Sequence, residues 1–472
     1  MIKIDGSLTP IQLKPDIQQV FTSAGPKIRD LDAAWDRSQG TPVYTVNGKY
    51  TTRGWTEWTQ GFQFGMPILQ FDGTGDSSFL EVGRRRTVEL MAPHVSHIGV
   101  HDHGFNNIST YGNLLRLMGE GRISHDEWEA EFYRLALKVS GAVQAARWTA
   151  LPNDLGYVYT FNGPHSLFVD TIRSMRILDV AHPFGHVLMG EGDRKISLLR
   201  RLLQHAETSA RFNVYFGNGK RDSYDIRGRT AHEAIFNTTN GAFRCPSSQQ
   251  GYSPFSTWTR GHAWILCGFS EELEFLSTLT EQEFSALGLP YFPDKQSVLN
   301  RFMEVARAAA DFYIEQMPSD GIPYWDTGAP NLHKLGDYQN RPADPYNQWE
   351  PVDSSAAAIA AQGLLRLGRY MQQGEASDPD AGTRYFQSGL TVASALCKEP
   401  YLSSDEDHQG LLLHSIYHRP NGWDHVQAGQ HIPNGESCMW GDYHLMELAV
   451  YLQRLAEDGP YLSFQAVDVK PH

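Results

Sequence analysis

The stretch Asp353-Ser-Ser-Ala-Ala-Ala-Ile-Ala-Ala-Gln362 indicates most clearly how this chain folds. Asp353 or Ser354 can cap the first turn of a helix, because each offers a side-chain oxygen to the unpaired backbone N–H groups there. The small residues that follow let a neighbouring helix approach closely. We therefore expect a helix over Ser354–Tyr370 that packs tightly against its neighbours.

Apolar residues recur at helical spacing along most of the chain, which predicts further helices on both sides of this stretch. The expected helices are Trp55–Phe71, Ser78–Met91, Asn106–Met118, Asp126–Thr149, His165–Ala181, Lys195–Phe212, Thr257–Thr278, Lys295–Gln316, Thr383–Leu396 and Tyr443–Leu455. Pro67 falls inside the first of them, so that helix is expected to kink or to form two shorter pieces. Strand-like alternation is sparse and confined to loops.

Many helices without an alternation of strands and helices indicate an all-α protein. Long loops at 214–256, 318–352 and 398–440 separate the helices, and loops held by a rigid scaffold usually carry the chemistry. Helix pairs with long loops at one end suggest a closed toroid, although the periodicity also fits a solenoid. Because no linker divides the chain, we expect a single domain over residues 1–472, whose N-terminal helix and lead-in segment occupy roughly residues 1–50.

The composition argues against nucleic acid and membranes as partners. The chain has 472 residues and a formal net charge of −14, and its longest basic run is Arg84-Arg85-Arg86. Nucleic acids and anionic membranes require a larger basic surface, and no stretch is apolar for long enough to span a bilayer. An acidic sugar is still compatible with this charge, because a few well-placed Arg, His and Gln side chains decide the local field. Nothing in the sequence points to a particular oligomeric state.

The cysteines indicate a reducing compartment. Cys245, Cys267, Cys397 and Cys438 are scattered along the chain and form no C-x-x-C pair, so we expect reduced thiols and a cytoplasmic protein. The first residues also lack the apolar run of a signal peptide. A leader removed from the chain would place the protein in the periplasm instead.

The segment Gln250-Gly-Tyr-Ser-Pro-Phe-Ser-Thr-Trp258-Thr-Arg260-Gly-His-Ala-Trp264 combines an amide, two indoles and a guanidinium. Ser256 or Thr257 can cap a helix here. Trp258 and Trp264 are six residues apart, so on a helix they lie on different faces, and we expect one of them to face a cavity. Aromatic faces beside an amide and a guanidinium suit a sugar ring that carries a carboxylate. A Trp-rich core helix with a solvated arginine is the alternative.

Two aspartates stand in unusual surroundings. Asp102 lies in a turn before one predicted helix, and Asp170 lies within the apolar run of another. Burial among apolar side chains would raise the pKa of Asp170 toward the neutral, proton-donating form. Two other interpretations stay open, namely Asp102 as a helix N-cap and Asp170 as the partner of Arg173 or Arg176 in a buried ion pair.

Three histidines close together invite a metal site. His97 and His101 have the i, i+4 spacing of a zinc-binding pair on a helix, but Gly99 argues against a helix there, and spacing places no third ligand. We therefore expect no metal and no cofactor, with His101 hydrogen-bonded and His103 solvated or packed. The absence of a Gly-rich phosphate loop, a Walker motif or a G-x-S-x-G elbow from the sequence disfavours nucleotide enzymes and serine hydrolases.

Five blocks of residues follow one another along the chain in a familiar order. They are Trp58-Thr-Gln-Gly-Phe-Gln-Phe-Gly-Met66, His101-Asp102-His-Gly-Phe105, Val169-Asp170-Thr-Ile-Arg-Ser-Met175, the Gln250–Trp264 segment and Asp353-Ser-Ser-Ala-Ala-Ala-Ile-Ala360. Together they resemble the unsaturated glucuronyl hydrolases, glycoside hydrolase family 88, and the last two blocks are the most specific. Pro323-Tyr-Trp-Asp326 and Trp440-Gly-Asp-Tyr443 resemble further blocks of this family.

The resemblance implies an (α/α)6 barrel with the active site in a cleft at one end. It implies that Asp170 is the general acid/base and that Asp102 is an essential neighbouring carboxylate. The sugar pocket that it implies is lined by Trp58, His101, His232, Gln250, Trp258, Arg260 and Trp264. His232 precedes Gln250 by eighteen residues, which is similar to the spacing in the family.

The activity that the resemblance implies is the removal of a Δ4,5-unsaturated uronic acid, which a polysaccharide lyase leaves at a non-reducing end. The reaction begins with acid-catalysed hydration of the C4=C5 double bond, and the partner is an unsaturated oligosaccharide. Two enzymatic alternatives are an unsaturated rhamnogalacturonyl hydrolase and an ordinary α/α-barrel glycosidase on saturated glycans. From a different class, the chain could be a sugar-binding protein without activity.

The chain departs from the pattern of the family at several positions. Thr171 and Ser174 replace asparagines that the family commonly has, and His262 stands where glutamine is frequent. Pro254-Phe255 replaces an acidic pair, and His103 replaces an apolar residue. We therefore expect the contacts to the sugar ring and to the leaving group to differ from those of typical members.

Overall fold

The computed structural model describes residues 1–54, 57–219, 224–373 and 378–463. Within this part of the chain, helices of an inner layer follow one another around a ring. They are α2 (Gln60–Thr74), α5 (His103–Asn107) with its continuation through the π-helical turn η3 (Ile108–Gly112) into α6 (Asn113–Gly119), α8 (Thr171–Ser174), α9 (Arg176–Ala181), α11 (Thr259–Thr278), α14 (Ser354–Gln373) and α16 (Met439–Ala456). Each contacts the next, and α16 packs against α2, so the ring is closed.

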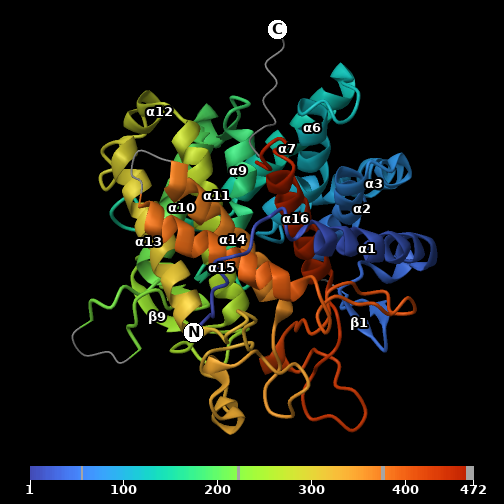
Figure 1. Cartoon of the computed structure of the whole chain (residues 1–472). Coiled ribbons are helices and arrows are strands. Elements are labelled where there is room, and N and C mark those ends of the chain that lie inside the picture. Colours follow the sequence, from blue (N-terminus) through green and yellow to red (C-terminus); the bar gives the residue numbers. More distant parts are fainter. Residues whose placement is uncertain (55–56, 220–223, 374–377, 464–472) are drawn as a thin grey trace.

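A second layer of helices surrounds this ring (Figure 1). It consists of α1 (Lys14–Ala34), α3 (Ser77–Leu90), α7 (Glu127–Ala146), α10 (Leu198–Phe212), α13 (Lys295–Gln316) and α15 (Pro379–Leu396). The burial pattern separates the layers, because α11 and α16 are buried along almost their whole length, whereas α7 and α3 bury one face. Alternating inner and outer helices in a closed ring confirm the predicted (α/α)6 barrel and exclude a solenoid.

Short elements join these helices. They are the helices α4 (Ala92–Val95) and α12 (Glu281–Ser285), the 3-10 turns η1 (Arg37–Gln39), η2 (Glu57–Thr59), η4 (Glu191–Asp193), η5 (Leu332–Leu335), η6 (Tyr338–Asn340) and η7 (Arg419–Asn421), and the strands β1 (Tyr44–Val46), β2 (Lys49–Thr51), β3 (Trp148–Ala150), β4 (Gly156–Val158), β5 (Ser166–Phe168), β6 (Val187–Met189), β7 (Lys195–Ser197), β8 (Glu233–Phe236) and β9 (Phe243–Ser247). Three strands form the antiparallel sheet β5-β8-β9, and the others pair as hairpins. The long loops gather at the end of the barrel where β1 and β9 lie, below the helices in Figure 1.

The structure corrects several predicted boundaries. The helix expected at His165–Ala181 is wrong over its first part, because Ser166–Phe168 forms strand β5 and helical structure begins only at Thr171. The apolar run in this segment is compatible with a helix or a strand. Its pairing with β8, a contact distant in sequence, makes it a strand. The first two residues of the helix expected at Trp55–Phe71 lie outside the described residues, and α2 continues through Pro67 as one helix.

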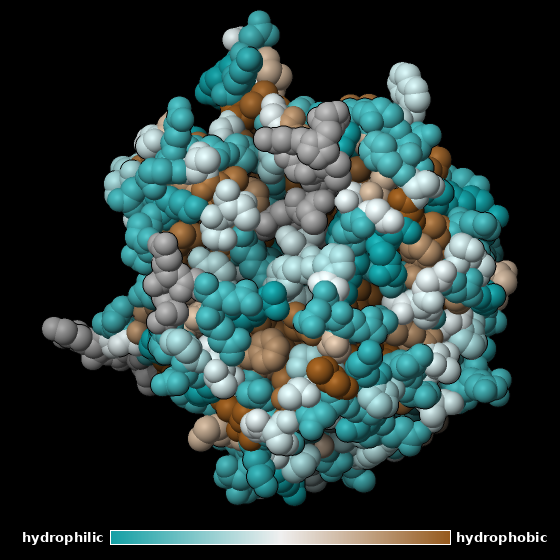
Figure 2. Space-filling view, turned by 45° about the horizontal axis from the view of Figure 1, so that its top comes forward, coloured by the Kyte–Doolittle hydropathy of each residue, from teal (hydrophilic) through white to brown (hydrophobic). Residues whose placement is uncertain are grey.

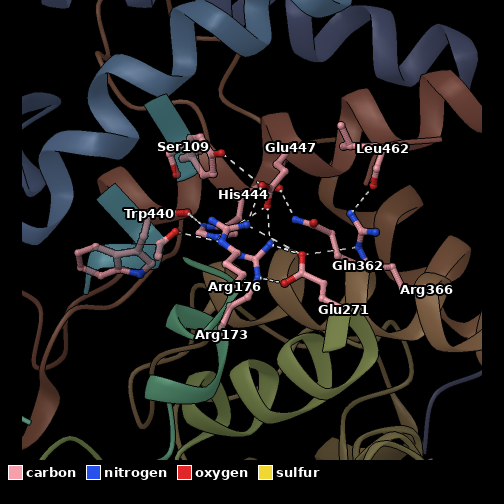
Figure 3. A network of polar contacts seen from close by, with 12 residues as sticks. Ser109, Arg173, Arg176, Glu271, Gln362, Arg366, Trp440, His444, Glu447 and Leu462 are labelled. Carbon is pink, nitrogen blue, oxygen red and sulfur yellow. Dashed lines mark hydrogen bonds and ion pairs between the residues drawn. The ribbon is translucent and has the colours of Figure 1, made fainter. Parts of the chain in front are cut away.

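A network of charged side chains lies buried between helices of the inner ring (Figure 3). Arg173 of α8 donates to Glu271 of α11 at 2.7 Å and to Glu447 of α16 at 3.0 Å. A further nitrogen of its guanidinium lies 2.9 Å from Nε2 of His444. Because buried charges are tolerated only when they are paired, these bonds fix the relative positions of three members of the inner ring.

Most of the face seen in Figure 2 is hydrophilic, and apolar side chains show there only in small separate groups. None of the helices in the described ranges is long and apolar enough to cross a membrane. All four cysteines are free thiols, as expected, and only Cys245 is exposed.

Candidate active site

The sheet β5-β8-β9 brings Asp170 and His232 together. Strands β5 and β8 are antiparallel with Phe168 opposite Glu233, so the residues just beyond this pair, Asp170 and His232, are neighbours. The backbone N–H of Val169 donates to the carbonyl of His232 at 2.9 Å. Asp170 therefore sits in the turn between a strand and α8, and not inside a helix as predicted.

Asp102 comes from the turn that precedes α5. It occupies the N-cap position of that helix, but its side chain makes no capping hydrogen bond, so the carboxylate is free for another role. The turn is held from behind, because the carbonyl of His101 accepts hydrogen bonds from Gln144 of α7 at 2.7 Å and from Ser174 of α8 at 2.6 Å. These contacts fix the turn against two helices.

His101 lies between the two carboxylates. Its Nε2 atom is 3.8 Å from Oδ1 of Asp102 and 3.8 Å from Oδ1 of Asp170. The imidazole is buried, and among the described residues neither ring nitrogen has a hydrogen-bond partner within bonding distance. The two side-chain carboxylates are only 10% and 13% exposed. The three groups thus form a compact acid–base cluster, which we call the Asp102–His101–Asp170 triad.

The charges within the triad shift its pKa values in a way that the sequence does not predict. Burial raises the pKa of Asp102 above its usual value. Burial also acts on Asp170, but the nearby His101 outweighs it and holds the pKa of Asp170 below the usual value. Burial alone would lower the pKa of His101, yet the two carboxylates raise it above 6.5. The prediction that burial makes Asp170 a neutral acid is therefore wrong for the unliganded protein.

Both indoles of the Gln250–Trp264 segment face one pocket. The prediction of different faces assumed that both lie on a helix, but α11 begins at Thr259 and Trp258 is its N-cap residue. Neither Ser256 nor Thr257 caps the helix. Because Trp258 precedes the helix, its ring can turn toward the same cavity as Trp264, which contacts Phe105 with ring centroids 4.9 Å apart.

Arg260 is engaged entirely by other groups of the protein. Its guanidinium donates to Asp353 at 2.8 Å and to the carbonyl of Tyr417 at 2.6 Å, and it also bonds the carbonyl of Ile416. The cation is stacked between the rings of Trp258 and Trp440, at 4.8 and 5.0 Å from their centroids. Arg260 thus borders the pocket and anchors the loop at residues 416–417. The alternative of a solvated arginine is therefore wrong.

The triad and these aromatic side chains line one pocket at the loop end of the barrel. Its lining residues are Trp58, His101, Asp102, Phe105, Phe161, Asp170, Gln250, Trp258, Arg260, Trp264, Tyr417, His418 and Trp423. The pocket holds about 50 Å³, which is room for a few water molecules at roughly 10–15 Å³ each. Phe161 lies at the rim of the pocket with 38% of its side chain exposed.

The structure places all but one of the predicted site residues on the pocket wall. The exception is His232, which is buried directly behind the wall. Its Nδ1 atom accepts a hydrogen bond from the backbone of Gln249 at 3.0 Å, and its ring packs against Phe168 and Trp258. Burial lowers the pKa of His232 to about 3, so the side chain is neutral and supports the wall.

Sequence reasoning missed five lining residues, namely Phe105, Phe161, Tyr417, His418 and Trp423. The last three come from the long loop predicted at 398–440. The segment from Tyr417 to Trp423 contains histidine and aromatic side chains at a density like that of the Gln250–Trp264 segment. That density was the available clue. Phe161 had no such clue, because contacts formed only in the fold hold its loop, such as those of Thr160 with Ser166 and of Asn162 with Glu233.

The departures from the family pattern lie outside the pocket lining. Ser174 holds the carbonyl of His101, and His103 bonds Ser140 of α7 at 2.8 Å. His262 bonds the carbonyl of Ala309 at 2.9 Å and faces α13. These side chains therefore act as supports behind the pocket, and the expected change in contacts to the ring does not come from them.

A larger hollow of about 680 Å³ lies on the outer surface between α1, α2, α3 and α16. Its charged side chains are paired with each other, as in the bond of 2.8 Å between Arg29 and Asp76 and that of 3.1 Å between Lys14 and Glu457. Its described lining residues include no buried carboxylate pair, and we therefore place the chemistry at the triad.

Comparisons with known proteins find relatives that span most of the chain. No protein-family model matches the chain. The unsaturated glucuronyl hydrolase of Bacillus sp. (strain GL1) is 26% identical over 449 residues, which cover 93% of this chain and 96% of the relative. The unsaturated chondroitin disaccharide hydrolase of Streptococcus agalactiae is 24% identical over 419 residues, or 87% of this chain and 84% of the relative. The crystal structure of the Bacillus enzyme, described as responsible for the degradation of glycosaminoglycan, has a TM-score of 0.68 at 23% identity and covers 93% of this chain and 97% of that chain.

Proposed function

We infer that this chain, which belongs to the unsaturated glucuronyl hydrolase family, removes a Δ4,5-unsaturated uronic acid of the glucuronyl type from the non-reducing end of lyase-generated oligosaccharides. The observation that carries this function is the triad, in which two carboxylates lie 3.8 Å from one imidazole nitrogen in a pocket walled by indoles. Indole faces suit a flat unsaturated ring, and a carboxylate pair suits acid–base chemistry. The relatives include a chondroitin disaccharide hydrolase and an enzyme responsible for the degradation of glycosaminoglycan, which favours glycosaminoglycan fragments as the substrates.

The double bond of such a substrate is an enol ether conjugated with a carboxylate, so hydration is the easy reaction. In our proposal Asp170 gives its proton to C4, and positive charge develops at C5 and the ring oxygen. The Asp170 carboxylate then takes a proton from a water molecule whose oxygen bonds to C5. The product is a hemiketal, which collapses to a C5 ketone with opening of the ring. The hemiacetal left at C1 expels the remaining sugar as an alcohol.

The source of the first proton follows from the electrostatics of the triad. In the unliganded protein the pKa of Asp170 is low and that of His101 is high, so the proton resides on His101 or Asp102. The carboxylate of the substrate adds a negative charge to a pocket from which water is displaced, and both effects raise the pKa of Asp170. Binding therefore moves the proton to the carboxyl group that needs it. Asp102 keeps the imidazole in place and shares its charge.

Deuterium labelling tests the reaction itself. Unsaturated glucuronyl disaccharides incubated with the protein in D2O should lose the ultraviolet absorbance of the conjugated double bond and gain one deuterium at C4. An ordinary glycosidase would release the unsaturated sugar with its absorbance intact and without label. A panel that includes unsaturated galacturonyl-rhamnose separates the rhamnogalacturonyl alternative, and binding without turnover on the whole panel would identify a sugar-binding protein.

Variants of the triad test the roles of its members. Asp170→Asn should abolish turnover, and Asp102→Asn should lower the rate by about 10²-fold or more. Asp179→Asn is a matched control, because Asp179 is a buried aspartate of α9 that is absent from the pocket lining. Unchanged turnover in Asp170→Asn would refute the role of Asp170 but would leave the reaction established by the labelling intact.

The domain organisation and the location of the protein are also proposals. We propose that residues 1–472 act as one catalytic domain, since the pocket draws its lining from positions between Trp58 and Trp423. We also propose a cytoplasmic location on the basis of the four free thiols.

A further inference from the structure

We propose that a second copy of this chain packs antiparallel against the outer face of α7, so that the protein is a two-fold symmetric dimer. Helix α7 presents Trp128, Phe132, Leu135, Val139 and Ala142 along this face. Their spacing alternates between four and three residues, which is the repeat of a coiled-coil seam. Such a seam needs a partner helix.

The seam is exposed, although its side chains are those of a core. Trp128 is 88% exposed, Leu135 60% and Phe132 43%. Val139 and Ala142 are half-buried. Isolated apolar side chains on a surface are ordinary, but a continuous row of them along one helix marks a binding surface. The ring of Phe132 meets that of Tyr111 in η3 edge to face, with centroids 5.9 Å apart, and 43% of the side chain is still exposed.

The charges beside the seam favour an antiparallel copy. Glu131 and Lys138 flank the seam on one side, seven residues apart. Glu131 also bonds Arg134 of its own helix at 2.6 Å, but its side chain is still 52% exposed. If two copies of α7 cross near Leu135 in opposite directions, Glu131 of each copy lies beside Lys138 of the other. The same crossing sets the bulky Trp128 against the short side chains near Ala142. In a parallel pair Glu131 and Lys138 would lie on the opposite side of the seam from their copies, so these contacts would not form.

The acidic start of α7 argues against a membrane as the partner. Asp126, Glu127, Glu129 and Glu131 occupy its first turns, whereas helices that lie on anionic membranes carry lysine and arginine beside the apolar face. The dimer also leaves the pocket open, because the opposite face of α7 carries Gln144, which holds the turn of the triad.

The oligomeric state and a charge swap test the dimer. Sedimentation equilibrium over a range of concentrations should give a dimer for the unaltered chain. Leu135→Glu should weaken the dimer by about a hundredfold, because it places two carboxylates in the seam. Ile11→Glu is the matched control, since Ile11 is 65% exposed on another part of the surface, and it should leave the dimer unchanged. Circular dichroism checks that each variant is folded.

Glu131→Lys and Lys138→Glu should each weaken the dimer by about tenfold, since each turns two attractive contacts into repulsive ones. An equimolar mixture of the two variants should restore a dimer, which then contains one copy of each. A monomer at all concentrations, a dimer that survives Leu135→Glu, or single variants whose mixture forms no dimer would overturn the proposal. A monomer that sediments with anionic lipid vesicles would overturn it in favour of a membrane surface.

Discussion

The guanidinium of Arg260 donates to the carboxylate of Asp353 at 2.8 Å, and this buried pair joins α11 to the start of α14. The same guanidinium bonds the carbonyl groups of Ile416 and Tyr417. Tyr417 and His418 in turn line the pocket. The arginine that the sequence marks for recognition thus acts first as the anchor of a pocket loop.

Arg260→Lys tests this anchoring role. Lysine keeps the charge but cannot reach three acceptors at once, so we expect the free energy of unfolding to fall by about 2–4 kcal/mol and KM to rise. Urea unfolding and steady-state kinetics measure the two effects. Arg244→Lys, at an exposed position on β9, is the control and should change neither. A higher KM with unchanged stability would mean that Arg260 binds the substrate directly.

The buried network around Arg173 should matter for stability and not for the reaction. Glu447 accepts from Arg173, and the charges of Arg173 and Arg176 overcome burial and lower the pKa of Glu447. Glu447→Gln leaves part of this buried positive charge unpaired, which should cost about 3–5 kcal/mol of unfolding free energy. Arg29→Met removes an exposed ion pair with Asp76 and should cost at most about 1 kcal/mol. Equal losses in urea titrations would contradict the importance of the network.

The barrel could be predicted from the sequence because its helices bury apolar faces at helical spacing. The Ser354–Tyr370 helix is confirmed as α14, which runs on to Gln373. Periodicity could not decide between toroid and solenoid, because closure depends on the contact between α2 and α16, which are far apart in the sequence. The residues around Asp170 were misplaced for the same reason, since β5 exists only through its pairing with β8.

The candidate site could be predicted where its residues are unusual for their surroundings. Asp102, Asp170 and Trp264 stand out in this way, and the structure brings them to one pocket. The pKa of Asp170 could not be predicted, because it depends on the 3.8 Å contact with His101 and not on burial alone. The engagement of Arg260 was equally hidden, since Asp353, Ile416 and Tyr417 lie more than ninety residues away along the chain.

Trp423 should contribute to substrate binding. Its ring lies 4.6 Å from that of His418 and 5.6 Å from that of Tyr417, centroid to centroid, on the pocket rim. Trp423→Ala removes an aromatic wall and should lower kcat/KM by about tenfold, mainly through KM. Trp349→Ala, whose ring is 41% exposed outside the pocket, should leave kcat/KM unchanged. Equal effects of the two substitutions would show that Trp423 does not touch the substrate.

The pH dependence of activity should report the proton on His101. The two carboxylates raise the pKa of His101 above 6.5. The triad therefore keeps the proton it needs until the pH exceeds this raised pKa. We expect kcat/KM to fall on the alkaline side at this pKa. In His101→Asn the proton can reside only on a carboxyl group, which loses it at a lower pH, so the alkaline limb should move down by about one unit or more. An alkaline limb that does not move would exclude His101 as the titrating group.

Stability gives an independent check on the same group. A pKa that is higher in the folded than in the unfolded chain adds stability below about pH 6.5, and this contribution is lost as the pH rises through the folded value. The unaltered chain should therefore exceed His101→Asn in unfolding free energy by more at pH 6 than at pH 9, because only at the lower pH does the folded triad hold the extra proton. Urea titrations at both pH values measure the difference. A gap that stays constant would mean that His101 stabilises the turn by packing alone and that its pKa is not raised.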